Sequence, residues 1–144
     1  MIKKLIYATL VGTVVSFLLG WLIYGVVLDS FMKSQTTEYT GLMREMDGTF
    51  IILILLSNLM MSFFIAFIFQ RWAKFETFFM GLTAGMMIGF FFAVSYDLYM
   101  LAAMNLFKAG GAIVDIIAST ILTGIIGGVI AWVLGFKSKA VPAQ

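Results

Sequence analysis

The sequence contains no cysteine, no histidine and only one proline. Without cysteine the chain cannot form a disulfide, a thiolate metal site or a thiol nucleophile. Without histidine it lacks the commonest metal ligand and the usual proton carrier near neutral pH, so zinc, haem and Ser-His hydrolysis are not expected. We therefore expect no metal site and no cofactor, and we do not expect an enzyme.

Charged residues are also scarce. They make up 11% of the 144 residues, whereas 62% are hydrophobic, and the mean hydropathy is +1.09. A helix needs about 20 apolar residues to cross a membrane. Four runs have this length: 5–28, 49–69, 77–96 and 113–135. The runs do not alternate as strands do, so the sequence predicts an all-α integral membrane four-helix bundle. We expect one domain over residues 1–136 and a disordered tail over 137–144.

The distribution of basic residues predicts the orientation, because short cytoplasmic segments carry an excess of Lys and Arg. On one side of the four spans lie Lys3, Lys4, Arg71, Lys74, Lys137 and Lys139, and on the other lie Lys33, Arg44 and Lys108. We therefore expect both termini to be cytoplasmic, in a bacterial cytoplasmic (inner) membrane. The net charge of +2 is explained by this topology, so lipid and not nucleic acid is the expected partner.

The only long polar stretch, residues 29–48, separates the first two spans. Its apolar residues recur at helical spacing at Tyr39, Leu42, Met43 and Met46. This spacing favours a short amphipathic helix over residues 37–46 on the outer membrane surface. A flexible loop is the alternative, because the segment is shorter than three helical turns.

Small residues recur at every fourth position in the last two spans, and each stripe leads to an aspartate. Such stripes let helices approach closely in lipid. The stripes are Gly81, Gly85, Gly89 and Ala93, and Ser119, Thr123, Gly127 and Ala131. Antiparallel packing would pair 81 with 131, 85 with 127, 89 with 123 and 93 with 119. This register places Asp97 opposite Asp115.

These two aspartates form the candidate site. Charges at membrane depth are costly and usually functional. Two facing carboxylates that are partly desolvated hold a proton, a cation or a ligand amine between them. Tyr96 is the neighbour of Asp97, and Lys108 is the nearest counter-charge in sequence. The pattern predicts a small carrier or ion-binding protein whose carboxylates, near the outer face, exchange a proton for a cation.

The last third of the chain resembles a family of small four-helix bacterial membrane proteins of unknown function. The similarity lies in Tyr96-Asp97-Leu98 with Leu101-Ala102, in Val114-Asp115-Ile116 and in Leu122-Thr123. The resemblance implies the four-span topology and draws attention to the two aspartates. It implies no activity.

Structural interpretations of the aspartates remain open. Asp115 could cap the fourth span, as Asp47 could cap the second. Asp97 could mark the water boundary, followed by a bend and an interfacial segment over residues 98–107. In addition, both Asp29 and Asp97 begin an Asp-x-aromatic-Met motif, which raises the alternative of a duplicated helical hairpin.

Two other functions also remain open. One is a structural or assembly subunit, as a homodimer or within a larger membrane complex. The other is an intramembrane aspartic protease, since Tyr96-Asp97 matches half of such an enzyme's signature while the sequence before Asp115 does not match the other half. The substrate and the oligomeric state cannot be derived from the sequence.

Overall fold

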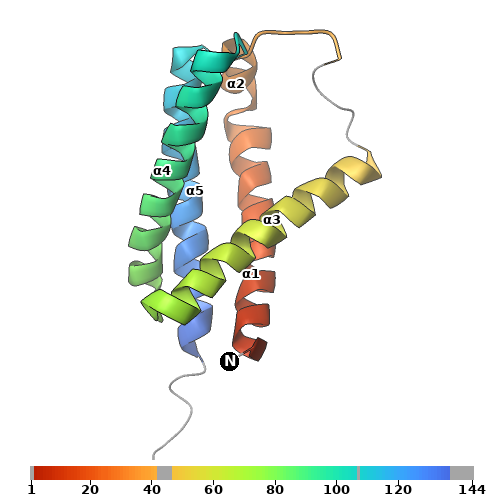
Figure 1. Ribbon diagram of the computed structural model, residues 1–144. Coiled ribbons are helices and arrows are strands. Elements are labelled where there is room, and N and C mark those ends of the chain that lie inside the picture. The colour runs from red at the N-terminus through yellow and green to blue at the C-terminus, as the bar shows by residue number, and fades with distance from the viewer. Residues whose placement is uncertain (1, 42–46, 107, 137–144) are drawn as a thin grey trace, which may run out of the picture.

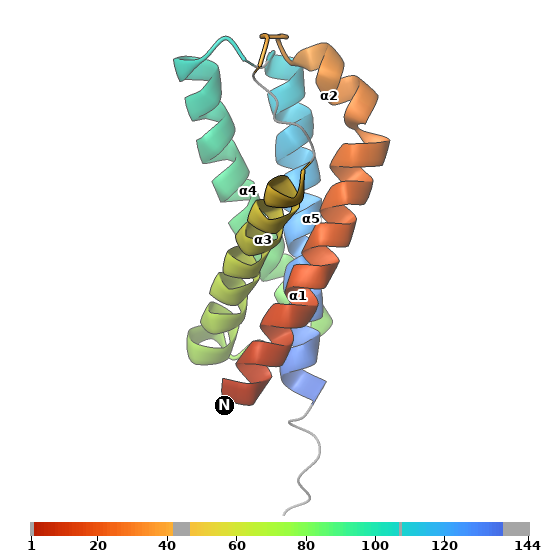
Figure 2. The same cartoon turned by 90° about the vertical axis from the view of Figure 1, so that its right-hand side faces the viewer.

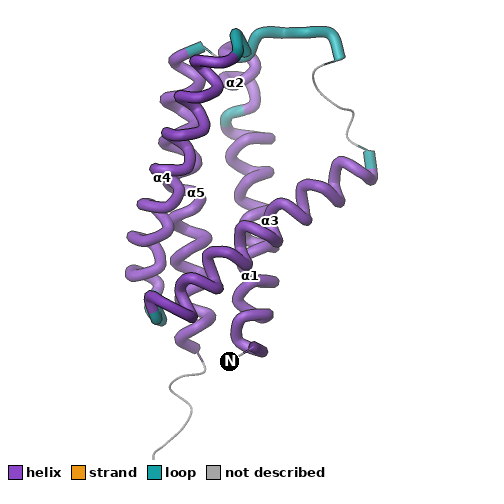
Figure 3. The backbone as a smooth tube through the Cα atoms, viewed as in Figure 1, coloured by secondary structure: helices purple, strands orange, loops and turns teal. Residues whose placement is uncertain are grey.

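The computed structural model describes residues 2–41, 47–106 and 108–136. Within these ranges the chain is helical and contains no strand (Figures 1 and 3). The α-helices are α1 (Ile2–Leu22), α2 (Asp29–Gln35), α3 (Gly48–Ile68), α4 (Phe78–Ala103) and α5 (Ala109–Phe136). Two π-helical segments, η1 (Ile23–Val27) and η2 (Phe69–Ala73), extend α1 and α3.

Four of these helical stretches are long and apolar enough to cross a membrane. They have 26, 26, 26 and 28 residues, in chain order. Large apolar side chains cover the outside of the bundle, for example Ile52, Phe91 and Leu98, which are 65%, 64% and 58% exposed. Such a surface is stable against lipid and not against water. The chain is therefore a multi-pass helical membrane protein.

The helices form a bundle in which α4 and α5 run antiparallel and side by side (Figures 1 and 2). Helix α1 packs on both α3 and α5, while α3 crosses the bundle obliquely. Helix α1 begins and α5 ends at the same end of the bundle. In a duplicated hairpin, α1 and α3 would pack against each other as α4 and α5 do. Helix α3 instead crosses obliquely, so the hypothesis of a duplicated hairpin is dropped.

The contact between α4 and α5 has the register predicted from the small residues. A β-carbon at Gly81 would lie 2.4 Å from the β-carbon of Ala131, and one at Gly85 would lie 3.2 Å from the α-carbon of Gly127. A β-carbon at Gly89 would lie 2.7 Å from the β-carbon of Thr123. The same three glycines also approach backbone carbonyl oxygens of α5, and the closest of these contacts would be 2.2 Å, from Gly81 to Gly127. The backbones therefore touch along the stripe, which only glycine permits.

The boundaries of the last two spans differ from those expected. Helix α4 continues past Tyr96 to Ala103, and α5 begins at Ala109 instead of Ile113. The predicted bend near Asp97 is therefore wrong, because neither proline nor glycine occurs between this residue and Ala103, and α4 runs through it unbroken. The capping interpretation of Asp115 is also wrong, since this residue lies inside α5. Asp47, by contrast, does cap α3, with Oδ1 accepting from the Phe50 amide at 2.7 Å.

The polar stretch after the first span is helical at an unexpected position. The helix is α2, whereas residues 37–41 are not helical and residues 42–46 lie outside the described residues. An ion pair between Lys33 and Asp29 at 2.8 Å stabilises α2. Beyond it, Thr37 donates its amide to the Leu106 carbonyl at 2.8 Å, and this extended pairing excludes a helix. The predicted tail over 137–144 also lies outside the described residues.

The apolar core lies toward the end of the bundle where α1 begins. It is built from α1, α3 with η2, and α5. Its buried members are Ala8, Ile65, Ala66, Phe69, Ile126, Ile130, Ala131 and Leu134. Polar groups gather toward the opposite end.

Candidate functional site

Asp97 of α4 and Asp115 of α5, hereafter the acid pair, meet at the helix contact. Their carboxyl groups lie close enough for each to feel the charge of the other. Asp97 is only 3% exposed, and its Oδ2 has no hydrogen-bond partner among the described residues. Burying a carboxyl oxygen without a partner is unfavourable. The fold therefore keeps Asp97 in a position that costs stability.

A short chain of hydrogen bonds connects the acid pair to the first span. The hydroxyl groups of Tyr24 and Ser119 lie 2.9 Å apart, and Ser119 Oγ donates to Asp115 Oδ2 at 3.3 Å. Tyr24 belongs to η1, and π-helical turns within α-helices are frequent at functional sites. Three of the four spans thus contribute side chains to one polar cluster.

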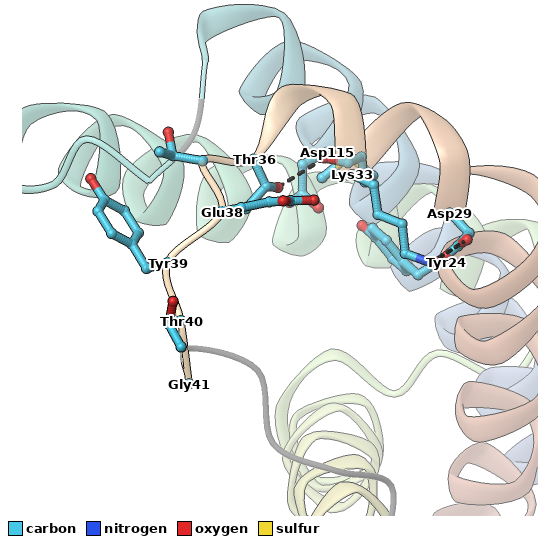
Figure 4. A pocket seen from close by; sticks show the side chains of 11 residues that line it. Tyr24, Asp29, Lys33, Thr36, Glu38, Tyr39, Thr40, Gly41 and Asp115 are labelled. Atoms are coloured by element: carbon cyan, nitrogen blue, oxygen red, sulfur yellow. Dashed lines mark hydrogen bonds and ion pairs between the residues drawn. The ribbon is translucent and has the colours of Figure 1, made fainter.

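A cavity of about 780 Å³ opens beside this cluster. Asp115 and Tyr24 form part of its wall, and α2 with the segment that follows it forms the rest. Figure 4 shows Glu38 close to Asp115 in this view, with the Asp29–Lys33 pair and Tyr24 to one side and Tyr39 to the other. The lining residues are Tyr24, Asp29, Met32, Lys33, Thr36, Thr37, Glu38, Tyr39, Thr40, Gly41 and Asp115.

The cavity is acidic. Its wall carries Asp29, Glu38 and Asp115 against a single basic residue, Lys33, which is paired with Asp29. Asp97 adds a further carboxyl group behind Asp115. A concave surface lined by one sign of charge concentrates ligands of the opposite sign. Its volume falls within the range of about 300–1,000 Å³ that is usual for small-molecule sites.

Two residues expected in the site do not point into it. Tyr96 is 59% exposed, because adjacent residues on an α-helix face different sides and Asp97 takes the inner one. Lys108 is exposed, and its Nζ donates to the Ser34 carbonyl at 3.0 Å. Lys108 therefore ties α2 to the start of α5 and is not the counter-charge of the acid pair.

Tyr24 and Glu38 are site residues that the sequence interpretation missed. For Tyr24 a signal exists, since it continues the stripe Ala8, Gly12, Ser16 and Gly20 at a spacing of four residues. A tyrosine near the end of a span is also typical of an aromatic at the membrane interface, which conceals this signal. No local pattern marks Glu38, which reaches the cavity because backbone hydrogen bonds join Thr37 to Leu106 and Gln35 to Lys108.

A smaller cavity of about 320 Å³ lies at the other end of the bundle. Lys4 and Lys74 line it together with Glu76, and Lys4 Nζ donates to the Leu134 carbonyl at 3.4 Å. Cations are favourable beside the carbonyl groups that end a helix. The two cavities thus differ in net charge, since carboxylates outnumber lysines in one and lysines outnumber carboxylates in the other.

The fold and the site define the class as a multi-pass helical membrane protein with an acid pair, of which Asp97 is buried and Asp115 lines the cavity. Within the described ranges, no three acidic side chains are grouped so as to hold a metal ion. Comparison with protein-family models, with curated proteins and with solved structures finds no match to this chain. The resemblance noted for the last third stays a prediction, and function must be argued from the site.

Proposed function

We propose that this protein is a small carrier or ion-binding protein of the bacterial inner membrane, in which the acid pair exchanges a proton for a cation. The observation that carries the proposal is the buried, unpartnered Oδ2 of Asp97 next to Asp115 on the cavity wall. With both termini in the cytoplasm, the cavity opens to the outer side. The cation enters there, and one proton leaves the acid pair when it binds.

An organic ammonium ion fits this cavity better than a metal ion. An ammonium group has up to three N–H donors, which can be shared between Asp115 and Glu38. Tyr24 and Tyr39 offer aromatic faces that attract cations, and Met32 offers apolar contact. The volume of the cavity also exceeds what a single dehydrated metal ion needs.

The test uses two ligands that share a ring. Benzylammonium and benzyltrimethylammonium carry the same charge, but only the first can donate hydrogen bonds. In lipid nanodiscs, calorimetry should show that benzylammonium binds with release of a proton and that benzyltrimethylammonium binds more weakly. Asp97→Asn should weaken benzylammonium binding about 30-fold or more, since loss of one member of a buried charged pair costs about 2–5 kcal/mol.

Asp47→Asn is the matched control. It makes the same chemical change at the residue that caps the N-terminus of α3, and asparagine can also cap a helix. We expect it to bind benzylammonium like the wild type. If Asp97→Asn and Asp47→Asn bind equally well, or if the wild type binds neither ligand, the proposed function is wrong.

An assembly subunit is the other function considered. It gains less support, because the stripes of Gly81, Gly85 and Gly127 that could serve a dimer are occupied by the contact between α4 and α5.

An aspartic protease would also need two facing carboxyl groups. In such an enzyme both reach the substrate, whereas here only Asp115 lines the cavity. Cleavage of a peptide substrate by the wild type but not by Asp97→Asn would favour the protease.

A further inference from the structure

One face of the first span is polar along most of its length. Thr9, Thr13, Ser16, Gly20 and Tyr24 follow one another at spacings of three or four residues, so they share one side of the helix. Thr9, Thr13 and Ser16 are buried. At these three residues the face therefore points into the bundle and not toward lipid, whereas Gly20 and Tyr24 are half-buried.

Helix α3 contributes two polar residues to the same contact. Ser16 donates a hydrogen bond to Asn58 Oδ1, and Asn58 Nδ2 donates to the Ile54 carbonyl at 2.9 Å. One turn along α3, Ser62 is fully buried and lies against Gly12 of α1. Hydroxyl and amide groups thus line the contact between the first two spans.

Two of these hydroxyl groups, Thr9 Oγ1 and Ser62 Oγ, have no hydrogen-bond partner in the part of the chain that the structure describes. Inside a helix, Ser and Thr usually donate to the carbonyl four residues earlier, as Thr13 does to Thr9 and Thr120 to Ile116. Polar residues that merely hold helices together in lipid are hydrogen-bonded to each other. Buried unpartnered hydroxyls indicate instead a small ligand that both donates and accepts, and water fits this description.

The polar face leads toward the acid pair. Gly20 is half-buried, and a β-carbon on it would meet no atom within 4 Å, so no side chain fills the space beside it between Ser16 and Tyr24. Tyr24 then bonds to Ser119, and Ser119 bonds to Asp115. From Thr9 to Tyr24 the helix rises about 22 Å at 1.5 Å per residue, which is most of the hydrocarbon thickness of about 30 Å.

We propose that this face, hereafter the hydroxyl path, holds water molecules that carry protons between the acid pair and the end of the bundle near Lys4. The path consists of Thr9, Ser16, Gly20 and Tyr24 with Asn58 and Ser62. Its only titratable groups among the described residues are Tyr24 and, through Ser119, the acid pair. The use that the protein makes of the proton rests on the proposed function. The existence of the path does not.

An apolar barrier closes the path beyond Thr9. Ala8, Ile65 and Phe69 are each no more than 1% exposed and belong to the core. Phe69 also lines the small cavity that holds Lys4, so it separates this cavity from the hydroxyl groups. Crossing this barrier is therefore the slow step for protons that enter or leave the path.

The experiment measures proton uptake into liposomes that contain the full-length protein and an internal pH-sensitive dye. A pH difference is imposed, with potassium and valinomycin present to balance charge. Thr9→Val keeps the shape of the side chain but removes its hydroxyl, and uptake should fall to the level of protein-free liposomes. Thr9→Ser restores the hydroxyl and should restore uptake. Thr120→Val is the matched control, since that hydroxyl already bonds within its own helix.

Benzylammonium binding is measured on the same variants. Thr9→Val should bind like the wild type, which shows that it is folded and that only proton movement has changed. Wild-type uptake by Thr9→Val, or equal loss in Thr9→Val and Thr9→Ser, would overturn the hydroxyl path. Uptake that depends on the Thr9 hydroxyl in a protein that does not bind benzylammonium would support the path while refuting the proposed carrier.

Discussion

Among single residues, Asp97 stands out because its surroundings do not stabilise it. It is 3% exposed, lies beside a second carboxyl group and leaves one oxygen unpartnered. Proteins tolerate such groups where function requires them, at some loss of stability. Asp47 is the contrasting case, since it accepts a hydrogen bond from Phe50 and has a purely structural role.

Asp97→Asn should therefore make the protein more stable. The amide carries no charge and can donate a hydrogen bond to Asp115. We expect a gain of about 1 kcal/mol, seen as a rise of about 2–4 °C in the midpoint of thermal denaturation in detergent. Asp47→Ala should have the opposite effect, because loss of a helix cap costs about 0.5–2 kcal/mol. A lower midpoint for Asp97→Asn would show that the acid pair stabilises the fold.

At the scale of the helices, α4 and α5 form the closest contact in the bundle. Their backbones touch at Gly81, Gly85 and Gly127, and this contact brings Asp97 to Asp115. Any widening of the contact would separate the two carboxyl groups. Packing and site are therefore coupled through the same register.

The glycines allow a matched pair of substitutions. In Gly85→Ala the new β-carbon would lie 2.4 Å from the carbonyl oxygen of Thr123, so the helices must move apart. We expect a loss of about 1–3 kcal/mol, measured by unfolding in detergent, and weaker benzylammonium binding. Gly20→Ala meets no atom within 4 Å and should be neutral or stabilising by about 0.5–1 kcal/mol. Equal effects of the two substitutions would contradict this account.

The sequence predicted those features that depend on local spacing. Four apolar runs and two stripes of small residues led to the all-helical fold and to the register that pairs Gly85 with Gly127. Helix ends were less accurate, because tertiary contacts extend α4 beyond Asp97 and start α5 at Ala109. The cavity could not be predicted, since it depends on how the segment that contains Glu38 folds back against Leu106 and Lys108.

For the whole molecule, the main feature is the asymmetry of its two ends. Lys4 and Lys74 line a cavity at one end, while Asp29, Glu38 and Asp115 line the cavity at the other. Basic residues mark the cytoplasmic side of membrane proteins. We therefore expect the acidic cavity to face outward in the cell.

The absence of cysteine makes this orientation simple to test. Single cysteines are introduced at two exposed positions, Ser30→Cys in α2 and Glu76→Cys between the second and third spans. In intact cells a membrane-impermeant maleimide should label Ser30→Cys, whereas Glu76→Cys should be labelled only after permeabilisation. Neither change removes a basic residue, so the topology signal is kept. Labelling in the reverse order would place the termini outside.

The length of α4 also sets the electrical depth of the site. Its 26 residues extend about 39 Å, roughly 9 Å more than the hydrocarbon layer, and Asp97 lies about 9 Å from the end of the helix. With α4 centred, the acid pair lies only about 5 Å inside the layer. A cation arriving from the cavity would cross little of the transmembrane field, whereas a proton on the hydroxyl path would cross most of it, at about 2.3 kcal/mol per 100 mV. The membrane voltage would then act on proton movement and hardly on cation binding.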